Sequence, residues 1–479
     1  MNINRRTLLA TTALLAGGTA CAACAPMAAT APGAASAATG LFDDIAQRTF
    51  RFFWDTTNPK NGLAPDRWPS APFASIAATG FALTAYPIGV ANGWISRAQA
   101  RERTLATLTF FRDAPQGPAE TGVAGHKGFF YHFLDLETGL RYGKTELSSV
   151  DTTLLLGGIL FAGQWFDQDH PDEARIRDLA QAIYARVEWP FLKNDKGAIS
   201  MGWHPESGMI PAAWVGYNEG MLVNILALGA PRHAIDPGLW DVWCSGYDDD
   251  WRGSTPDTRY LAFAPHFGHQ YSHVWVDFRN IQDKAMRGAG LDYFENSRRA
   301  TYAQRAYAIA NPMGWQSYSR DVWGLTACDG PGGGTHEYRG EQRQFRTYSA
   351  RGPVSMPDAF DDGTIAPTAA VASLPFAPEI VEPAARALRS FQNGRIYGEY
   401  GFLDAFNPSF VWPEMKGPRG TVDPQLGWVD DDMLGIDQGP ILAMIANHQS
   451  DFVWKTMRDV PAIRTGLQRA GFTGGWLDA

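Results

Sequence analysis

The sequence predicts an all-α protein built as an (α/α)6 toroid, in which six inner helices are ringed by six outer helices. Apolar positions recur at helical spacing along the chain, while sustained strand alternation is rare. Residues 75–92, in "SIAATGFALTAYPIGVAN", are apolar on almost every side, whereas residues 96–112 are two-faced. Apolar inner and amphipathic outer helices that alternate in this way are typical of the toroid, with long loops over its wide end. A two-domain helical protein is the alternative.

The helical spacing places the elements in order along the chain. It predicts helices at residues 42–54, 75–92, 96–112, 152–166, 172–189, 218–228, 277–289, 295–311, 366–372, 375–391 and 437–457. Long connections rich in Gly, Pro and Trp separate them. Short strands are expected at most in "FRTYSA" (345–350) and "GRIYGEYG" (394–401).

Residues 1–40 are expected to be an export signal followed by an Ala/Pro-rich linker, so that 41–479 form a single catalytic domain. Arg5 and Arg6 precede an apolar run that is too short to span a membrane. The paired arginines suggest twin-arginine export, and Cys21 or Cys24 allows a lipid anchor. We therefore expect a periplasmic or outer-membrane-associated protein.

Composition indicates a soluble globular protein that binds a neutral partner. Of the 479 residues, 45% are hydrophobic and 19% charged, and the net charge is −9 without Lys/Arg clusters. Nucleic acid and anionic membranes are therefore not expected as partners. Aromatic residues make up 13% of the chain, with 17 Trp, and such rings stack on sugar faces. A monomer acting on an oligo- or polysaccharide, with no cofactor and no metal, is expected. Cys244 and Cys328 either pair as a disulfide or stay free.

Carboxylates at the starts of apolar helices are the main candidates for chemistry, because phosphate-loop, zincin and nucleophile-elbow motifs are absent. Glycoside hydrolysis needs two of them, an acid and a base or nucleophile. Glu219, in "AAWVGYNEGMLVNILALG", is the first. If Asn218 caps the helix, the helix dipole favours ionised Glu219, whereas burial against aromatic rings raises its pKa. Glu219 is thus either a catalytic acid or a helix-start residue.

Glu146 and Asp151 lie in "KTELSSVDTTLLLGGIL". Ser148 to Asp151 matches a capping box, so Asp151 serves helix formation or the site. Glu146 lies outside that box and is the better site candidate.

Two more candidates lie near the C-terminus, in "GWVDDDMLGIDQGPILAMI" and "YGEYGFLDAFNPSF". The run from Asp430 to Asp432 is expected to be a solvated turn, with calcium binding as the alternative. Asp437 precedes Pro440 and an apolar helix, so it either caps that helix or belongs to the site. Asp404 is embedded in aromatic residues.

Polar and aromatic residues in other loops are expected to bind substrate. Arg67 and Arg279 either serve the site or simply pair with Asp66 and Asp277. A metal is not favoured for His266, His269 and His273, because matching carboxylate or cysteine ligands are missing. The expected substrate-binding residues are Asp66, Arg67, His126, Lys127, Tyr131, Asp135, Asp151, Trp203, His204, Trp214, Tyr217, His269, Gln270, Tyr271 and Trp275.

These segments together resemble the bacterial glycoamylase-like domain, the fold of glycoside hydrolase family 144, whose characterised members are β-1,2-glucanases. The matching runs are "GLAPDRWP", "SIAATGFALTAYPIG", "GHKGFFYHFLDLETGLR", "ELSSVDTTLLLGGIL", "AAWVGYNEGMLVNIL", "FGHQYSHVWVDFR" and "LGIDQGPILAMI". The resemblance covers the chain from about Phe42 to its end. It implies an (α/α)6 toroid that cleaves β-1,2-glucans to sophoro-oligosaccharides with inversion of configuration.

The resemblance also assigns roles to individual residues. Glu219, in the Y-N-E-G motif, would be the general acid, and Glu146 would lie in the cleft. The base transfers less directly, and we expect it to be Asp437 or Asp404. Exo action, another β-glucan or glycan substrate, and a non-catalytic glycan-binding lipoprotein are the alternative functions.

Overall fold

The computed structural model describes residues 40–354, 356 and 359–479. The expected export signal and nearly all of the linker lie outside the described residues. The first helix, α1 (Leu41–Thr56), begins where the sequence places the start of the folded part. Among the described helices, none combines the length and apolar character needed to cross a membrane.

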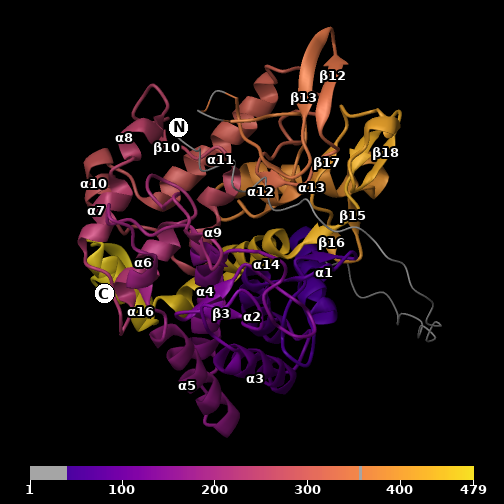
Figure 1. The fold of residues 1–479 in the computed structure, drawn as a ribbon. Coiled ribbons are helices and arrows are strands. Elements are labelled where there is room, and N and C mark those ends of the chain that lie inside the picture. The colour runs from indigo at the N-terminus through magenta and orange to yellow at the C-terminus, as the bar shows by residue number, and fades with distance from the viewer. Residues whose placement is uncertain (1–39, 355, 357–358) are drawn as a thin grey trace, which may run out of the picture.

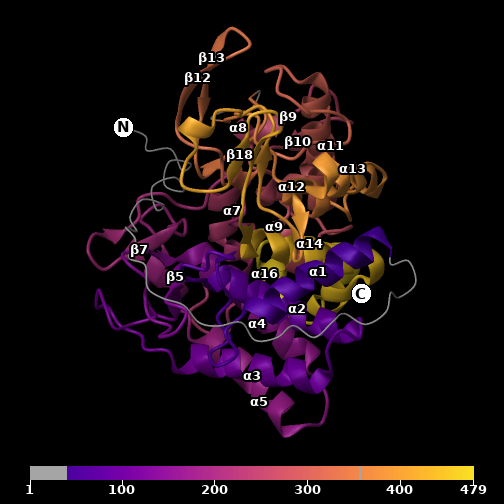
Figure 2. The ribbon, with the colours of Figure 1, turned by 90° about the vertical axis from the view of Figure 1, so that its right-hand side faces the viewer.

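Six helices form a closed inner ring, which runs in chain order. Neighbours pack directly or are joined by hydrogen bonds: Leu222 N–H donates to Ser272 Oγ, and the Gln270 amide donates to the Ala369 carbonyl. Figures 1 and 2 both show α14 lying against α2 in the middle of the molecule. The inner helices are α2 (Ile76–Ala91), α4 (Ser149–Trp165), α6 (Met221–Gly229), α9 (Tyr271–Trp275), α12 (Pro367–Val371) and α14 (Gly435–Ser450).

Each inner helix, or the turn that leads into it, has an outer partner, which confirms the predicted (α/α)6 toroid. Helix α3 packs on α2, α5 on α4, α16 on α6, α11 on the turn before α9, α13 on α12, and α1 on α14. These outer helices are α1, α3 (Arg97–Asp113), α5 (Pro171–Ala185), α11 (Tyr293–Ala310), α13 (Pro378–Ser390) and α16 (Pro461–Arg469). Shorter helices are α7 (Gly238–Cys244), α8 (Tyr247–Asp250), α10 (Lys284–Ala289), α15 (Phe452–Met457), η2 (Trp189–Leu192), η3 (His266–His269), η4 (Phe391–Gly394), η5 (Pro413–Met415) and η6 (Gly475–Leu477).

All six inner helices begin at the same end of the ring. The Thr368 hydroxyl, at the start of α12, donates to the Asp437 carbonyl at the start of α14. The N–H of Ile76, the first residue of α2, donates to the carbonyl of His132, whose own N–H donates to Glu146 beside the start of α4. Residues far apart in the sequence but next to a helix start are therefore gathered at one place.

Short strands in the long loops connect these helix starts. Strand β1 pairs with β20, which brings Arg67 opposite Leu434, and a five-stranded sheet β3-β4-β6-β7-β8 leads into α4. The hairpin β12–β13 projects from the end opposite α3 and α5 (Figure 1). The strands are β1 (Arg67–Trp68), β2 (Ala74–Ser75), β3 (Gly125–His126), β4 (Phe129–Tyr131), β5 (Phe133–Leu134), β6 (Leu147–Ser148), β7 (Gly202–His204), β8 (Gly208–Met209), β9 (Trp251–Arg252), β10 (Tyr260–Leu261), β11 (Ala327–Cys328), β12 (Gly334–Tyr338), β13 (Glu341–Phe345), β14 (Ser349–Ala350), β15 (Tyr397–Gly398), β16 (Gly401–Phe402), β17 (Phe406–Asn407), β18 (Thr421–Asp423), β19 (Gly427–Val429) and β20 (Met433–Leu434).

The structure corrects several expected boundaries. The helix expected at 437–457 is divided by Asp451, whose φ of 52° is left-handed and ends α14. Of the helix expected at 277–289 only α10 forms, because the left-handed φ of 61° at Asn280 interrupts the helix and Asp283 caps α10 by accepting from Met286 N–H. Helices α7, α8, α9 and α16 were not predicted. Cys244 and Cys328 are both free, so the disulfide alternative is wrong.

Helices α2 and α4 approach each other closely through two glycines. A Cβ placed on Gly158 would lie 2.0 Å from the Gly80 carbonyl oxygen, and one on Gly80 would lie 2.3 Å from the Leu154 carbonyl oxygen. Backbone atoms cannot move aside as a side-chain end can. Helices α2 and α4 can therefore pack this closely only if positions 80 and 158 carry no side chain.

We expect Gly158→Ala to destabilise the protein by about 1–3 kcal/mol, the usual cost of overpacking a core. The measurement is the urea midpoint followed by tryptophan fluorescence. Gly288→Ala is the matched control, because Gly288 lies in α10 with nothing within 4 Å of its Cβ position. That control should be neutral or slightly stabilising. Equal midpoints for the two variants would contradict the close approach.

Candidate active site

Glu219 lies in the turn immediately before α6. The helix begins at Met221, and the Asn218 side chain accepts a hydrogen bond from Gly220 N–H at 2.9 Å. The sequence suggested that Glu219 lies in the first helical turn. It lies before that turn instead, and it does not cap the helix. Its side chain is 7% exposed. Capping of α6 therefore does not explain this buried carboxylate.

Asp437 and Asp404 form a buried carboxyl pair at the start of α14. Helix α14 has Leu434 at its N-cap and no side-chain cap, so capping does not explain Asp437. Burial raises the pKa of Asp437 to about 7, although a hydrogen bond from Asp404 opposes the rise. Burial and the charge of Asp437 raise the pKa of Asp404 well above its usual range. Both pKa values are raised, so the pair holds a proton near neutral pH.

Asp404 also belongs to an acidic cluster with Asp329 and Asp430, in which one oxygen of each carboxylate lies within 4.8 Å of the others. Arg67 neutralises part of this charge through Asp329 at 2.5 Å. Burial, followed by the charges of Asp329 and Asp404, raises the pKa of Asp430 to about 10. The cluster is therefore held together by an arginine and by bound protons.

The solvated turn expected at residues 430–432 is wrong for two of its three residues. Asp430 is 3% exposed and Asp432 is 1% exposed, while Asp431 is exposed. Asp432 accepts hydrogen bonds from Ser70 N–H and from Arg419, at 3.0 and 2.5 Å. The β1–β20 pairing brings these groups together, and that pairing could not be read from the local sequence.

We expect Asp430→Asn to stabilise the protein increasingly as pH rises. Asp430 has a folded-state pKa raised above the unfolded value, so its contribution to stability is fully present below about pH 4 and is lost toward pH 10. The slope for one proton is at most about 1.4 kcal/mol per pH unit. Melting temperatures at pH 5 and pH 9 measure the effect. Asp431→Asn, on the exposed neighbour, is the control, and the same pH dependence in both variants would contradict the prediction.

A second charged group lies beside the start of α4 and comprises His132, Glu146 and Asp151. Ser148 caps α4 as predicted, and its hydroxyl donates to Asp151 Oδ2 at 2.5 Å. His132 Nδ1 lies 2.9 Å from Glu146 Oε1, and its Nε2 lies 3.5 Å from Asp151 Oδ1. Asp151 is thus part of both the cap and this group, so its two proposed roles are compatible.

Three of these carboxylates act electrostatically on Tyr271, the first residue of α9. Burial raises the pKa of Tyr271 well above its usual range, and the charges of Asp437, Glu219 and Asp151 add to the rise. Carboxylates from α14, from α4 and from the turn before α6 therefore all affect the pKa of this one hydroxyl group. Carboxylates from these three elements therefore lie near one side chain.

Apart from Asp151 and Tyr271, described above, the residues expected to bind substrate divide into three sets. Asp66 and Arg67 lie beside the acidic cluster and are paired with each other at 3.1 Å, as predicted. Partly exposed side chains lie around the five-stranded sheet, where the rings of His126 and Trp203 are 5.3 Å apart. This second set comprises His126, Lys127, Trp203 and His204. Lys127 pairs with Glu188 at 3.1 Å.

The third set consists of residues whose side chains make contacts within the fold. Gln270 donates to the Ala369 carbonyl, and Trp275 stacks on Phe81 in the ring interior. Binding of substrate by the residues of this set stays a prediction. The set comprises Tyr131 under Arg141, Asp135 in a turn with Thr138, Trp214 bonded to Ser149, Tyr217 bonded to Ser297, His269 bonded to Phe263 N–H, Gln270 and Trp275.

His132 and Asp329 lie in these charged groups but were not predicted from the sequence as site residues. Asp329 stands in "ACDGPGGG", a carboxylate in a Gly-rich loop, which is the same signal that singled out the other candidates. His132 stands between aromatic residues in "FFYHFL", and nothing in its neighbours distinguishes it from a core histidine. Only its long-range approach to Glu146 and Asp151 identifies it.

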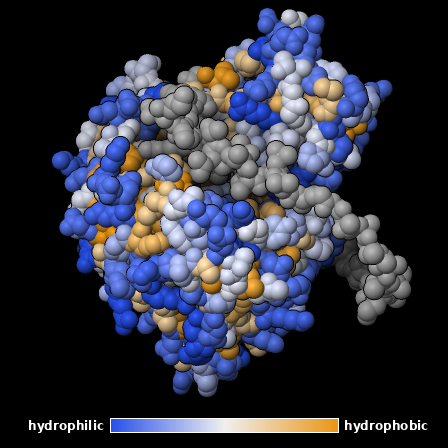
Figure 3. Space-filling view, in the orientation of Figure 1, coloured by the Kyte–Doolittle hydropathy of each residue, from blue (hydrophilic) through white to orange (hydrophobic). Residues whose placement is uncertain are grey.

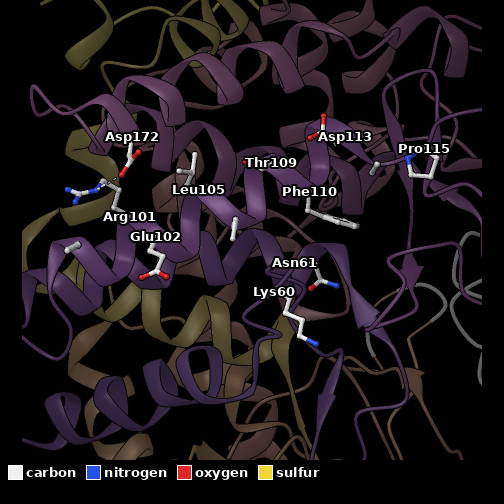
Figure 4. Close-up of a pocket in the computed structure, with 13 residues that line it drawn as sticks. Lys60, Asn61, Arg101, Glu102, Leu105, Thr109, Phe110, Asp113, Pro115 and Asp172 are labelled. Atoms are coloured by element: carbon white, nitrogen blue, oxygen red, sulfur yellow. Dashed lines mark ion pairs between the residues drawn. The ribbon is translucent and has the colours of Figure 1, made fainter.

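Surface features elsewhere do not compete with this site. An open groove of about 830 Å³ runs along α3, and none of the carboxylates described above lines it (Figure 4). Arg101 and Asp172 approach each other within it at 3.6 Å. On the face shown in Figure 3, the described surface is mainly hydrophilic with smaller hydrophobic areas.

Comparisons with known proteins agree with this architecture. The exo beta-1,2-glucooligosaccharide sophorohydrolase (non-reducing end) of Parabacteroides distasonis is 27% identical over 461 residues, 90% of this chain. The chain spans 57% of that relative's length. A structure of the endo-beta-1,2-glucanase from Chitinophaga pinensis, complexed with sophorotriose and glucose, is 26% identical with a TM-score of 0.75. The alignment covers 91% of this chain and 99% of that one.

A second solved structure, the beta-1,2-glucanase from Parabacteroides distasonis, is 26% identical with a TM-score of 0.74 and covers 90% of this chain and 60% of that one. The family model named Glycoamylase, described as "Putative glucoamylase", matches residues 211–461, which is more than half of the chain. The matched segment contains Glu219, Tyr271, Asp404 and Asp437. The chain therefore belongs to the Glycoamylase family.

Proposed function

We propose that the protein hydrolyses β-1,2-linked glucans to short oligosaccharides with inversion at the anomeric carbon. The names of its relatives support the substrate, since one is a sophorohydrolase and another an endo-beta-1,2-glucanase. The observation that carries the proposal is the buried Asp404–Asp437 pair, since Asp437 and Glu219 both act electrostatically on Tyr271.

Glu219 is the general acid and Asp437 the general base in this proposal. Asp404 retains the proton of the pair, so it donates a hydrogen bond to Asp437 and leaves that carboxylate free to accept a proton from water. The water oxygen attacks the anomeric carbon as its proton passes to Asp437. Glu219 gives its proton to the departing glycosidic oxygen, whose bond to that carbon breaks. Inverting enzymes hold the two carboxyl groups about 6.5–9.5 Å apart so that water fits between them.

The test is incubation with linear and cyclic β-1,2-glucans, β-1,3- and β-1,4-glucans and starch. We expect cleavage of β-1,2-glucan, with the first product seen by proton NMR as the α-anomer. A ladder of oligosaccharides indicates endo action and a single disaccharide indicates exo action. Degradation of starch alone would overturn the substrate, and a β-anomeric first product would overturn inversion.

Export of the protein as a monomer belongs to the same proposal. A polymeric glucan is met outside the inner membrane, and Arg5, Arg6, Cys21 and Cys24 in the sequence support export with a lipid anchor. Cell fractionation with Cys21→Ala and Cys24→Ala, together with light scattering of the purified protein, tests both points. Retention of the protein in the cytoplasm would overturn the first, and a stable dimer the second.

A further inference from the structure

His132 is held in place by the backbone on both sides. It follows β4 and precedes β5, its N–H donates to the Glu146 carbonyl at 3.0 Å, and its carbonyl accepts from Ile76 N–H at 3.3 Å. Its ring stacks on Phe133 with centroids 3.8 Å apart. The imidazole therefore has little freedom to turn.

Both ring nitrogens of His132 face a carboxylate. Nδ1 lies 2.9 Å from Glu146 Oε1 and Nε2 lies 3.5 Å from Asp151 Oδ1. A neutral imidazole has one N–H, whereas an imidazolium has two and can donate to both. The three side chains are 20%, 21% and 11% exposed, so they reach the site while remaining poorly solvated.

The charges around the ring favour the imidazolium. Burial alone would lower the pKa of His132, but Asp151, Glu146 and Asp66 outweigh it and raise the pKa to about 9. Burial would raise the pKa of Glu146, yet His132 and the charge of His204 lower it. Burial raises the pKa of Asp151, against the opposing effects of His132 and the Ser148 hydroxyl. His132 thus favours the ionised form of both carboxylates.

The same three residues have the chemistry of metal ligands, with ligand atoms within 4.8 Å of one another. A metal would take one ring nitrogen and draw both carboxylates to it. Here each carboxylate lies at a different ring nitrogen: Nδ1 is hydrogen-bonded to Glu146, and Nε2 forms an ion pair with Asp151, which is the arrangement expected around one imidazolium.

We propose that His132 is a positioning residue whose imidazolium, hydrogen-bonded to Glu146 and ion-paired with Asp151, holds both carboxylates as acceptors for substrate hydroxyl groups. The inference rests on the proposed function. It gives Glu146 and Asp151 a binding role and leaves proton donation to Glu219. No carbohydrate contact of His132 itself is required.

The test compares His132→Gln with wild type on β-1,2-glucan oligosaccharides. Gln keeps one neutral donor and loses the charge, so we expect kcat/KM to fall about 10- to 100-fold, mainly through KM. The acidic limb of the kcat/KM profile should move to higher pH, because Glu146 and Asp151 then bind protons more readily. Wild-type activity should also decline as His132 loses its proton near pH 9, and the variant should lack that decline. His448→Gln, on the exposed end of α14, is the matched control.

Titration of the wild-type His132 Cε1–H by NMR, assigned through the variant, reads the imidazolium without any substrate. An ordinary His132 pKa near 6.5, or a variant with unchanged KM and pH profile, would overturn the inference. Loss of wild-type activity in EDTA with recovery on adding Zn²⁺ would overturn it in favour of a metal site. Absence of cleavage with a confirmed titration near pH 9 would instead count against the proposed function alone.

Discussion

Replacing Glu219 by Gln is expected to lower kcat on β-1,2-glucan by about 10²- to 10⁴-fold, the usual contribution of a general acid. Gln keeps the shape of the side chain in the turn before α6 but has no proton to give the glycosidic oxygen. Because Glu219 does not cap α6, the fold should be unaffected. The measurement is kcat with purified oligosaccharides at the pH optimum, with a melting curve to show intact folding.

The leaving group separates an acid from other roles. In a 4-nitrophenyl glycoside of the same oligosaccharide, the nitrophenolate group leaves without being protonated. Glu219→Gln should therefore cleave this substrate with a much smaller loss of kcat. A variant equally impaired on both substrates would contradict the acid role, and a fully active variant would exclude Glu219 from the reaction.

Asp437→Asn is expected to lose about 10²- to 10⁴-fold in kcat on both the glucan and the nitrophenyl glycoside, because activation of water is needed for either leaving group. In wild type, kcat/KM should rise with pH through about 7 as Asp437 ionises. The raised folded-state pKa means that the stability contributed by protonated Asp437 is lost as pH rises from about 4 through 7. The variant should therefore melt no lower than wild type at pH 8, which would exclude misfolding as the cause.

Variants of Asp404 decide which member of the pair is the base. Asp404→Asn keeps a hydrogen-bond donor to Asp437 and should remain active, with the acidic limb close to that of wild type. Asp404→Ala removes the donor that lowers the pKa of Asp437, so its acidic limb should move to higher pH. An inactive Asp404→Asn beside an active Asp437→Asn would reverse the assignment.

Local sequence patterns predicted the helices well, but they did not predict which charged side chains lie together. The periodicity of residues 75–92 and 96–112 placed α2 and α3, and the Ser148 capping box placed α4, because these signals depend on neighbours in the chain. The pairs Arg67–Asp66 and Arg279–Asp277 were predicted for the same reason and are confirmed. The five-residue α9 was missed, because a short helix whose every side chain is buried shows no polar face.

The acidic residues show where local reasoning fails. Asp430 and Asp432 are in a charged run that is typical of a solvated turn, yet Arg419, Ser70 and bound protons compensate their burial. Ser70 lies far from these residues in the chain, and Arg419 lies in the loop before β18. A group's pKa depends on such partners, so the sequence of a turn does not predict it.

The sequence by itself determined the helical class, the alternation of inner and outer helices, the family resemblance and the carboxylates worth testing. Tertiary structure alone decided which carboxylates meet, that Asp404 shares a proton with Asp437, and that His132 bridges Glu146 and Asp151. Periodicity and capping are interactions within a few residues, which the sequence records directly. Protonation and pairing depend on groups that only the closing of the ring brings within a few ångströms.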